Sequence, residues 1–396
     1  MGVAREDRYA PIPRATWGVL LPPVTPDELR QRFSATEAYT VGVEEELMLV
    51  AADTLDLAPA IEPVLAALAG DPRFREELRA AQIEIVTPVC ASAADAEAFL
   101  HEGRRDLGDA GGEHVGIAGA GTHPRSTSWG QISPGERYQL IAELYPWASQ
   151  RGIACGMHVH VAIGDADRAL AVYNALRSYV PELAAFAANS PFLEGRDTGH
   201  ASMRASLNEA FPRAGIPPAF SSWREFVDLL DWGRSSGSFP DATFLWWELR
   251  PHPGFGTLEL RVADCQTAVE DAGAVAAVAQ SLAAWLGGQY DAGEELPVHD
   301  AFRIAENRWS ALRFGLGGWL LDLDSGAPRP TRARLTALLD DLEPFGARLG
   351  CADQLEHART LIADNGAERQ RYVAERDGLD GLLRWLVQRT VPATPA

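Results

Sequence analysis

Residues 40–50 read Thr-Val-Gly-Val-Glu-Glu-Glu-Leu-Met-Leu-Val, and the fold is predicted outward from this stretch. Apolar residues on both sides indicate a β-strand inside a core, yet consecutive carboxylates occupy its centre. Side chains alternate between the faces of a strand, so Glu44 and Glu46 share one face and Glu45 takes the other. Like charges on an apolar strand are costly to desolvate unless a cation lies between them. The strand therefore predicts a Mg²⁺ or Mn²⁺ site, with a solvated edge strand as the alternative.

The bulk composition limits the class of protein. The 396 residues carry a formal charge of −20, which argues against non-specific binding to nucleic acid or to anionic membranes. No apolar run approaches the roughly 20 residues of a membrane span, and residues 1–23 do not form a secretory signal. The cysteines lie far apart, at positions 90, 155, 265 and 351. This spacing argues against a disulfide framework and a structural zinc site, and the default location is cytoplasmic.

Helical segments separate the predicted strands. Capping-box patterns at residues 25–28 and 133–136 predict helix starts. Further helices are predicted over residues 60–69, 72–80, 92–111, 165–188 and 222–233, and the chain is mostly helical after residue 268. No internal repeat or long linker appears. We expect an irregular N-terminal lead-in over residues 1–36 and a single catalytic domain over residues 37–390.

Three further strands also carry ionisable groups in an apolar β pattern. Residues 81–88 contain Glu84 on the face opposite their isoleucines. Residues 155–161 place His158 and His160 on one face, and the second strand of a hairpin predicted over residues 243–263 does the same for Glu259 and Arg261. For each strand alone, a solvated face or buried, hydrogen-bonded histidines are alternatives.

The four strands together favour one interpretation. Solvated faces on all of them would expose a large share of one sheet, so a curved sheet with a polar concave face is more economical. Carboxylates and histidines suit Mg²⁺ or Mn²⁺ bridging phosphate oxygens. Arg261 would supply fixed positive charge where phosphoryl transfer develops negative charge. A charged loop over residues 192–204, which includes Arg196, has the composition of a substrate-binding loop.

A series of motifs in this order resembles the type 2 glutamate–cysteine ligases, the YbdK-like carboxylate–amine ligases of the glutamine synthetase superfamily. The motifs are Gly-Val-Glu-Glu-Glu (42–46), Gln-Ile-Glu-Ile-Val-Thr (82–87), Gly-Thr-His-Pro (121–124), Cys-Gly-Met-His-Val-His-Val (155–161), Asn-Ser-Pro-Phe-Leu-Glu-Gly-Arg-Asp-Thr-Gly (189–199), Trp-Trp-Glu-Leu-Arg-Pro-His-Pro (246–253), Gly-Thr-Leu-Glu-Leu-Arg-Val-Ala-Asp (256–264) and Glu-Asn-Arg-Trp-Ser-Ala-Leu-Arg-Phe-Gly (306–315). They span most of the chain, and their order is far more specific than any one of them.

The resemblance implies an α+β fold of the glutamine synthetase type. This fold has a largely antiparallel sheet that curves into a funnel-shaped active site, with helices packed outside. Without the resemblance, the alternation of strands and helices would suggest a parallel sheet instead. The resemblance also implies a set of metal ligands, namely Glu44, Glu46, Glu84, His158 and Glu259. Catalytic roles are implied for Glu46, Glu259 and Arg261. Substrate binding is predicted for Arg204, Arg250, His160 and Arg196, with a structural salt bridge as the alternative for Arg204 and Arg250.

The implied reaction is ATP-dependent amide formation through an acyl phosphate, with Mg²⁺ or Mn²⁺ as cofactor. The expected substrates are a small carboxylate, such as glutamate, and an amine, such as cysteine, and a homodimer is possible. The sequence has no phosphate-binding G-x-x-x-x-G-K-[ST] loop, so metals and the sheet would hold ATP. A metal-dependent amide hydrolase and a catalytically silent ligand-binding protein are the alternatives.

Overall fold

One main antiparallel sheet runs through the molecule in the computed structural model, which describes residues 21–127 and 130–392. Most of the predicted lead-in, residues 1–20, lies outside the described residues. The sheet order is β2–β3–β1–β5–β9–β8, and β4 pairs with the distal half of β1. The strands are β1 Val41–Ala51, β2 Phe74–Glu76, β3 Gln82–Val86, β4 Val115–Ala118, β5 Met157–Ala162, β8 Leu249–His252 and β9 Thr257–Leu260.

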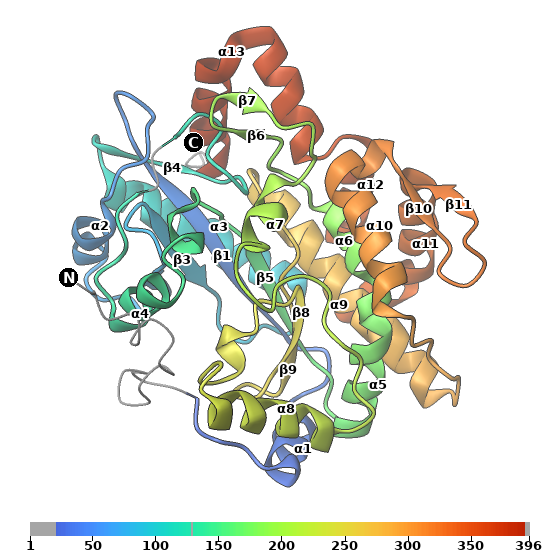
Figure 1. The fold of residues 1–396 in the computed structure, drawn as a ribbon. Coiled ribbons are helices and arrows are strands. Elements are labelled where there is room, and N and C mark those ends of the chain that lie inside the picture. The colour runs from blue at the N-terminus through green and yellow to red at the C-terminus, as the bar shows by residue number, and fades with distance from the viewer. Residues whose placement is uncertain (1–20, 128–129, 393–396) are drawn as a thin grey trace, which may run out of the picture.

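Strand β1 is the centre of this sheet (Figure 1). Its first half pairs with β5 on one side and β3 on the other, and its second half pairs with β4. Leu47 and Leu49 on one face are fully buried, as expected for a strand in the middle of a core. The opposite face of the first half carries Glu44 and Glu46, so the two faces differ sharply in polarity.

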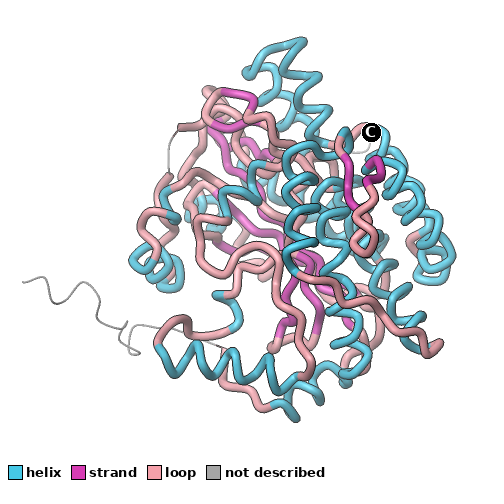
Figure 2. Tube along the Cα trace, turned by 45° about the vertical axis from the view of Figure 1, so that its right-hand side comes forward, coloured by secondary structure: helices cyan, strands magenta, loops and turns pink. Residues whose placement is uncertain are grey.

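Helices cover the apolar face of the sheet. Helices α3 (Ala93–Gly111) and α9 (Val269–Asp291) pack against β1 and against each other, and α5, α11 and α12 pack around α9. Figure 2 shows the strands in the interior of the molecule, with helices and loops around them. The remaining helices are α1 Pro26–Ala35, α2 Ile61–Ala67, α4 Glu136–Leu144, α5 Ala166–Leu176, α6 Val180–Phe186, α7 Met203–Asn208, α8 Trp223–Ser236, α10 Ala301–Phe314, α11 Thr331–Leu349, α12 Ala352–Ala363 and α13 Gly366–Thr390.

The antiparallel sheet with helices outside confirms the predicted α+β fold, and the parallel alternative is excluded by the strand pairing. Two short hairpins lie outside the main sheet, β6–β7 (Phe192–Leu193 with Arg196–Asp197) and β10–β11 (Trp319–Leu321 with Pro328–Pro330). Within the described ranges, no helix is long and apolar enough to cross a bilayer. The cysteines are buried and unpaired with one another.

Three local expectations were wrong. Residues 72–80 do not form a helix, because Phe74–Glu76 pair with β3 instead; tertiary pairing overrides their helix propensity. Ser133 does not cap α4, which begins after Gly135 with no side-chain cap. The long helix predicted over residues 165–188 is divided into α5 and α6, which are joined by a 3₁₀ turn, and α6 carries proline in its first turn. The Thr25 capping box is present as predicted.

Candidate active site

The strand register aligns the predicted site residues across the sheet. Glu44 of β1 lies opposite His158 of β5, and Glu46 lies opposite Glu84 of β3. His160 lies opposite Glu259 of β9, which in turn lies opposite Arg250 of β8. Directly opposed residues in antiparallel strands project on the same face. Residues from five strands therefore meet on the polar face that β1 alone suggested.

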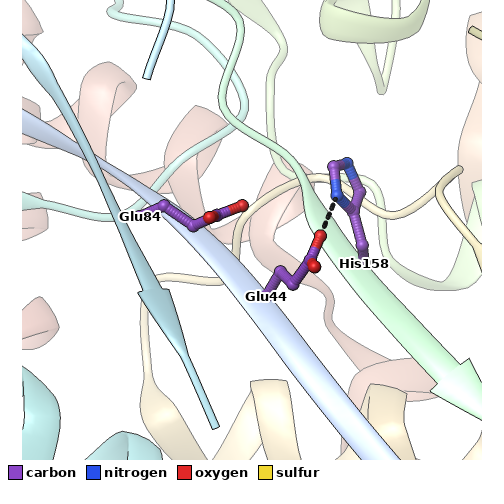
Figure 3. A group of neighbouring side chains, drawn as sticks. All are labelled: Glu44, Glu84 and His158. Carbon is purple, nitrogen blue, oxygen red and sulfur yellow. Dashed lines mark hydrogen bonds and ion pairs between the residues drawn. The ribbon is translucent and has the colours of Figure 1, made fainter. Parts of the chain in front are cut away.

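Two groups of side chains on this face have the spacing of metal sites. One consists of Glu44, Glu84 and His158, and the other of Glu44, His160 and Glu259; in each, candidate ligand atoms lie within 4.8 Å of one another. Figure 3 shows the first group, with side chains from three strands directed towards a shared space. Glu44 belongs to both groups, which makes it the central carboxylate of the site.

The histidines of these groups have nitrogens that a cation would satisfy. His158 Nδ1 lies 3.2 Å from a Glu44 oxygen, whereas its Nε2 is buried and has no hydrogen-bond partner. His160 Nδ1 contacts the Thr257 hydroxyl at 2.9 Å, and its buried Nε2 lies 3.4 Å from a Glu44 oxygen and 3.9 Å from a Glu259 oxygen. Burial and the nearby Arg261 lower the pKa of His158, which favours the neutral ring that binds metals. The donor set of carboxylates and imidazoles fits Mg²⁺ or Mn²⁺.

The carboxylates of the site cannot all ionise easily in the absence of a cation. Burial, together with the charges of Glu44, Glu77 and Glu46, raises the pKa of Glu84 well above its ordinary value. Burial also opposes ionisation of Glu44, but hydrogen bonds from His158 and His160 outweigh it and hold that pKa well below the usual range. In the absence of a cation, a protonated Glu84 thus lies beside an ionised Glu44. A bound cation would favour the ionised form of both carboxylates, so Glu84 would lose its proton.

Glu259 is held between two arginines. Arg250 donates from Nε and Nη2 to its two carboxylate oxygens at 2.8 and 2.9 Å, and Arg261, two residues after Glu259 in the chain, donates to the same carboxylate. Burial opposes the charge of Glu259, but the two guanidinium groups hold its pKa well below the usual range. The structural salt bridge that was the alternative for Arg250 is therefore present. Arg261 also lies 3.4 Å from His158 Nδ1, so it borders both metal groups.

Glu46 is fixed by the backbone of the neighbouring strand. The N–H of Gly156 donates to Glu46 at 2.5 Å, and Gln82 Nε2 lies 3.4 Å from the same oxygen. Gly156 has a further role, because a Cβ there would lie 2.0 Å from a guanidinium nitrogen of Arg204. Glycine thus lets Arg204 pass close to the strand. Glu46 lies outside the two compact metal groups, with its other oxygen 3.7 Å from His158 Nε2.

Arg204 differs from Arg250 in its partners. Its side chain is buried, and its nearest acceptors are the carbonyls of Arg261 and Val262 at 3.2 and 3.4 Å. No carboxylate among the described residues pairs with it, and its Nε has no partner. The salt-bridge alternative therefore does not apply to Arg204 in this part of the chain. A buried guanidinium facing a cavity is suited to a substrate carboxylate.

Two cavities adjoin the metal groups. The first, of about 350 Å³, is lined by Glu44, Glu46, Glu84 and His158 together with several arginines, including Arg204 and Arg261. The second, of about 620 Å³, lies towards the start of β1 and has mainly apolar walls. Its lining includes Val41, Val43, Val86, Pro88, Val89, Ala162 and Phe255. Both cavities reach Glu44, which thus stands at their junction.

Two residues that were predicted to bind substrate, Arg196 and His160, do not line the first cavity. Arg196 lies on the exposed β6–β7 hairpin with 75% of its side chain accessible, and it does not line either cavity. Solvent exposure accounts for the charged composition of that loop, and substrate binding by Arg196 stays a prediction that the lining of neither cavity supports. His160, predicted to bind substrate, lines the second cavity and also belongs to a candidate metal group.

Other cavity residues gave no local signal in the sequence. Glu77 and Arg79 follow the short strand β2 and line the first cavity, together with Tyr138 and Trp246. Burial and the charge of Glu46 raise the pKa of Glu77 to about 8. Residues 74–79 are good helix formers, and only their pairing with β3 directs them towards the site.

Comparisons with known proteins agree with this geometry. The sequence model of glutamate–cysteine ligase family 2 (GCS2) matches residues 40–389. Two proteins of Rubrobacter xylanophilus, provisionally named glutamate–cysteine ligases 2-1 and 2-3, are 38% and 39% identical. These alignments cover 90% and 91% of this chain and 96% and 100% of the relatives.

Solved structures show the same fold at low sequence identity. The glutamate–cysteine ligase of Francisella tularensis, determined in complex with AMP, superposes with a TM-score of 0.63 at 13% identity, covering 90% of both chains. A bifunctional glutathione synthetase of Pasteurella multocida superposes with a TM-score of 0.64 at 15% identity, covering 92% of this chain and 53% of that one.

Proposed function

The chain belongs to glutamate–cysteine ligase family 2 and is an ATP-dependent ligase that forms carbon–nitrogen bonds, and we propose that it joins glutamate to an amine such as cysteine. We infer that the γ-carboxylate of glutamate is activated as an acyl phosphate. One observation carries the proposal. Two candidate metal groups sharing Glu44 lie at the junction of an arginine-lined cavity and an apolar one.

The metal groups would hold Mg²⁺ or Mn²⁺ through the side chains described above. Glu44, Glu84 and His158 would hold one ion, and Glu44, His160 and Glu259 a second. When bound, such ions neutralise phosphate charge and align the phosphoryl group for in-line transfer. The buried Nε2 atoms support this assignment, because that of His158 has no hydrogen-bond partner among the described residues and that of His160 lies near oxygens of both Glu44 and Glu259.

The apolar cavity fits the base of ATP. Its walls are mainly aliphatic and aromatic, with Glu37 and Arg75 among the polar residues, and it meets the site at Glu44, His160 and Thr257. A base in this cavity would leave the phosphates towards the carboxylates of the sheet. This placement explains how a chain without a phosphate-binding glycine loop holds its nucleotide.

Arg261 would stabilise the transferred phosphoryl group. Its ion pair with Glu259 and its contact with His158 fix the guanidinium at the edge of the metal groups. A donor held in place before the reaction costs no reorganisation when charge develops on the phosphoryl oxygens. Arg250, which is bound to Glu259 on both oxygens, would instead position that carboxylate.

The first cavity would hold the two substrates to be joined. Arg204 is the candidate for the α-carboxylate of glutamate, since it is buried, cationic and unpaired with any described carboxylate. The γ-carboxylate oxygen attacks the terminal phosphorus as its bond to ADP breaks. The amine nitrogen then attacks the acyl carbon, and the carbon–oxygen bond to phosphate breaks as the amide forms.

Phosphate release by the purified protein tests the proposal. We expect release that requires ATP, Mg²⁺, glutamate and an amine, with cysteine first in the panel, and an amide product by mass spectrometry. Glu46→Gln and Arg261→Ala should abolish it while the protein remains folded. No release with any amine, with nucleotide and metal shown to bind, would refute the ligase proposal. Zinc-dependent amide cleavage without ATP would identify a hydrolase instead.

A further inference from the structure

The outer face of α10 carries large aromatic side chains. Its inner face is buried through Ile304, Ala311 and Leu312, and the helix packs against α6. On the outer face, Phe302 and Trp309 lie about two turns apart and are 70% and 56% exposed. The outer face of such a helix normally carries polar residues. Aromatic side chains there indicate a contact surface if they belong to a continuous patch.

The β10–β11 hairpin extends this apolar surface beyond the helix. Figure 1 shows the hairpin beside α10, at the right of the molecule, and Ser310 of the helix donates to the carbonyl oxygen of Trp319 at 2.6 Å. The rings of Trp309 and Phe314 meet edge to face, with centroids 5.7 Å apart. We call the resulting patch the aromatic face; its side chains, all between 41% and 70% exposed, are Phe302, Trp309, Phe314, Trp319 and Leu321.

The aromatic face is large enough to hold two copies of the chain together. A large aromatic side chain presents roughly 200 Å², so these half-exposed side chains leave on the order of 500 Å² of apolar surface in total. A stable interface buries about 800 Å² on each partner, part of it in a polar rim. The aromatic face therefore supplies most of the area that a stable dimer needs.

The hairpin is not placed to accept an added strand. Asn307 closes the free edge of β10, because it accepts from the N–H of Leu321 and donates to the carbonyl oxygen of the same residue, both at 2.7 Å. The other strand, β11, begins and ends with Pro328 and Pro330, which have no N–H to donate. A partner would therefore contact the aromatic face through side chains, as packed helices do, and not through a shared sheet.

Opposite charges flank Trp309 on the outer face of α10. Glu306 lies three residues before it and Arg313 four residues after it, so all three share one side of the helix. Along the helix axis Glu306 and Arg313 are about 10 Å apart, too far to pair with each other. Within residues 21–127 and 130–392, neither forms an ion pair. In two antiparallel helices related by a two-fold axis between residues 309 and 310, position 306 of each lies level with position 313 of the other.

We propose that the aromatic face binds a second copy of the chain, with the two α10 helices antiparallel about a two-fold axis beside Trp309. The two tryptophans pack at the axis, and Glu306 of each copy pairs with Arg313 of the other. A two-fold contact must be complementary to itself, and an apolar centre with one charge of each sign meets that condition. The aromatic centre supplies most of the affinity, and the charges fix the register. The dimer does not depend on the proposed ligase function.

Sedimentation equilibrium of the purified full-length protein tests the dimer. We expect a dimer with a Kd in the micromolar range or below. Trp309→Glu places two like charges at the axis and should raise this Kd by about 30-fold or more. Trp232→Glu, a matched change at a tryptophan that is 62% exposed on α8, should leave the Kd unchanged. A monomeric wild type would overturn the proposal, as would a dimer that Trp309→Glu leaves intact.

Charge exchange tests whether the partner is a second copy in this register. Glu306→Arg and Arg313→Glu should each raise the Kd by about 10-fold or more, because like charges then meet twice. A mixture of these two variants should form a mixed dimer with the wild-type Kd, since opposite charges face each other again. Both changes in one chain should restore the dimer for the same reason. Failure of the mixture and of the double variant to associate would overturn the antiparallel contact.

Folding controls separate dissociation from structural damage. Circular dichroism and thermal denaturation should match the wild type for each variant, because the replaced side chains lie on the surface and line neither cavity. If Trp309→Glu does not fold, Phe302→Glu, at the most exposed position of the aromatic face, takes its place with the same expected rise in Kd. A folded Phe302→Glu protein with an unchanged Kd would then overturn the proposal.

Discussion

Glu45 and Arg104 form an ion pair in which both side chains are completely shielded from solvent, on the face of β1 opposite Glu44 and Glu46. Arg104 comes from α3, which covers this face of the sheet. Adjacent glutamates of one strand thus serve separate purposes. Glu45 joins the sheet to its helical layer, and Glu44 and Glu46 face the cavity.

Substitution of Glu45 should lower stability, whereas substitution of the neighbouring Glu44 should abolish metal binding and turnover. Glu45→Gln leaves the Arg104 charge buried without its counter-ion and should lower the free energy of unfolding by about 3–5 kcal/mol, as measured by urea denaturation. Glu44→Gln removes one of several crowded carboxylates and should leave stability near wild type while abolishing Mg²⁺ binding and turnover. An unchanged stability of Glu45→Gln would contradict the structural role of this pair.

The metal-free protein should lose stability as pH rises from about 6.5 to 8, above the range in which His123, His158 and His252, whose pKa values are lowered by burial, take up protons on unfolding. Glu77, with a folded pKa raised to about 8, and Glu84, also raised, bind protons more tightly in the folded state than in the unfolded state, where the ordinary value is 4.5. Their contribution is complete below the unfolded pKa and is lost as pH rises through the folded pKa. The free energy of unfolding should fall by no more than about 1.4 kcal/mol per pH unit for each proton that is released.

Saturating Mg²⁺ should remove this pH dependence, because a bound cation favours the ionised carboxylates. Thermal or chemical denaturation in EDTA and in Mg²⁺ across this pH range gives the comparison. Calorimetry in buffers of different ionisation enthalpy should also show proton release on Mg²⁺ binding near pH 7. A flat stability profile in EDTA would mean that the acidic residues are solvated in the free protein.

Arg204 and Arg250 should respond differently to replacement by lysine. Arg204→Lys removes the planar donor for the glutamate carboxylate and should raise the KM for glutamate by about 10-fold or more, with little change in the KM for ATP. Arg250→Lys breaks the two-point contact with Glu259 and should weaken Mg²⁺ binding and lower kcat. Steady-state kinetics with each substrate varied in turn measures these effects. A raised KM for glutamate in Arg250→Lys, with only kcat lowered in Arg204→Lys, would contradict the assignment of the two arginines.

Arg196→Ala should leave catalysis unchanged. The side chain lies on the exposed β6–β7 hairpin, outside both cavities, and its nearest carboxylate is Glu194 at 4.0 Å. Exposed ion pairs contribute little to stability, so the melting temperature should also stay near wild type. A rise in the KM for either substrate would instead support the predicted role of this loop in substrate binding.

Much of the site could be predicted from the sequence. Strand alternation placed Glu44 and Glu46 on one face and Glu45 on the other, and the same rule paired His158 with His160. These inferences held because the two-residue period of a strand is a local property of the backbone. The ordered motifs then indicated the family and the antiparallel sheet, which local periodicity did not distinguish from a parallel one.

The partners of these residues depended on the tertiary structure. Register across the sheet, set by long-range hydrogen bonds, brought Glu84 opposite Glu46 and His160 opposite Glu259. Pairing with β3 turned helix-forming residues into β2 and so directed Glu77 and Arg79 into the cavity. The sequence by itself determined which side chains share a face. Only the folded chain decided that Arg250 has a carboxylate partner and that Arg79 and Arg204 have none among the described residues, because a guanidinium is neutralised by what lies beside it in space.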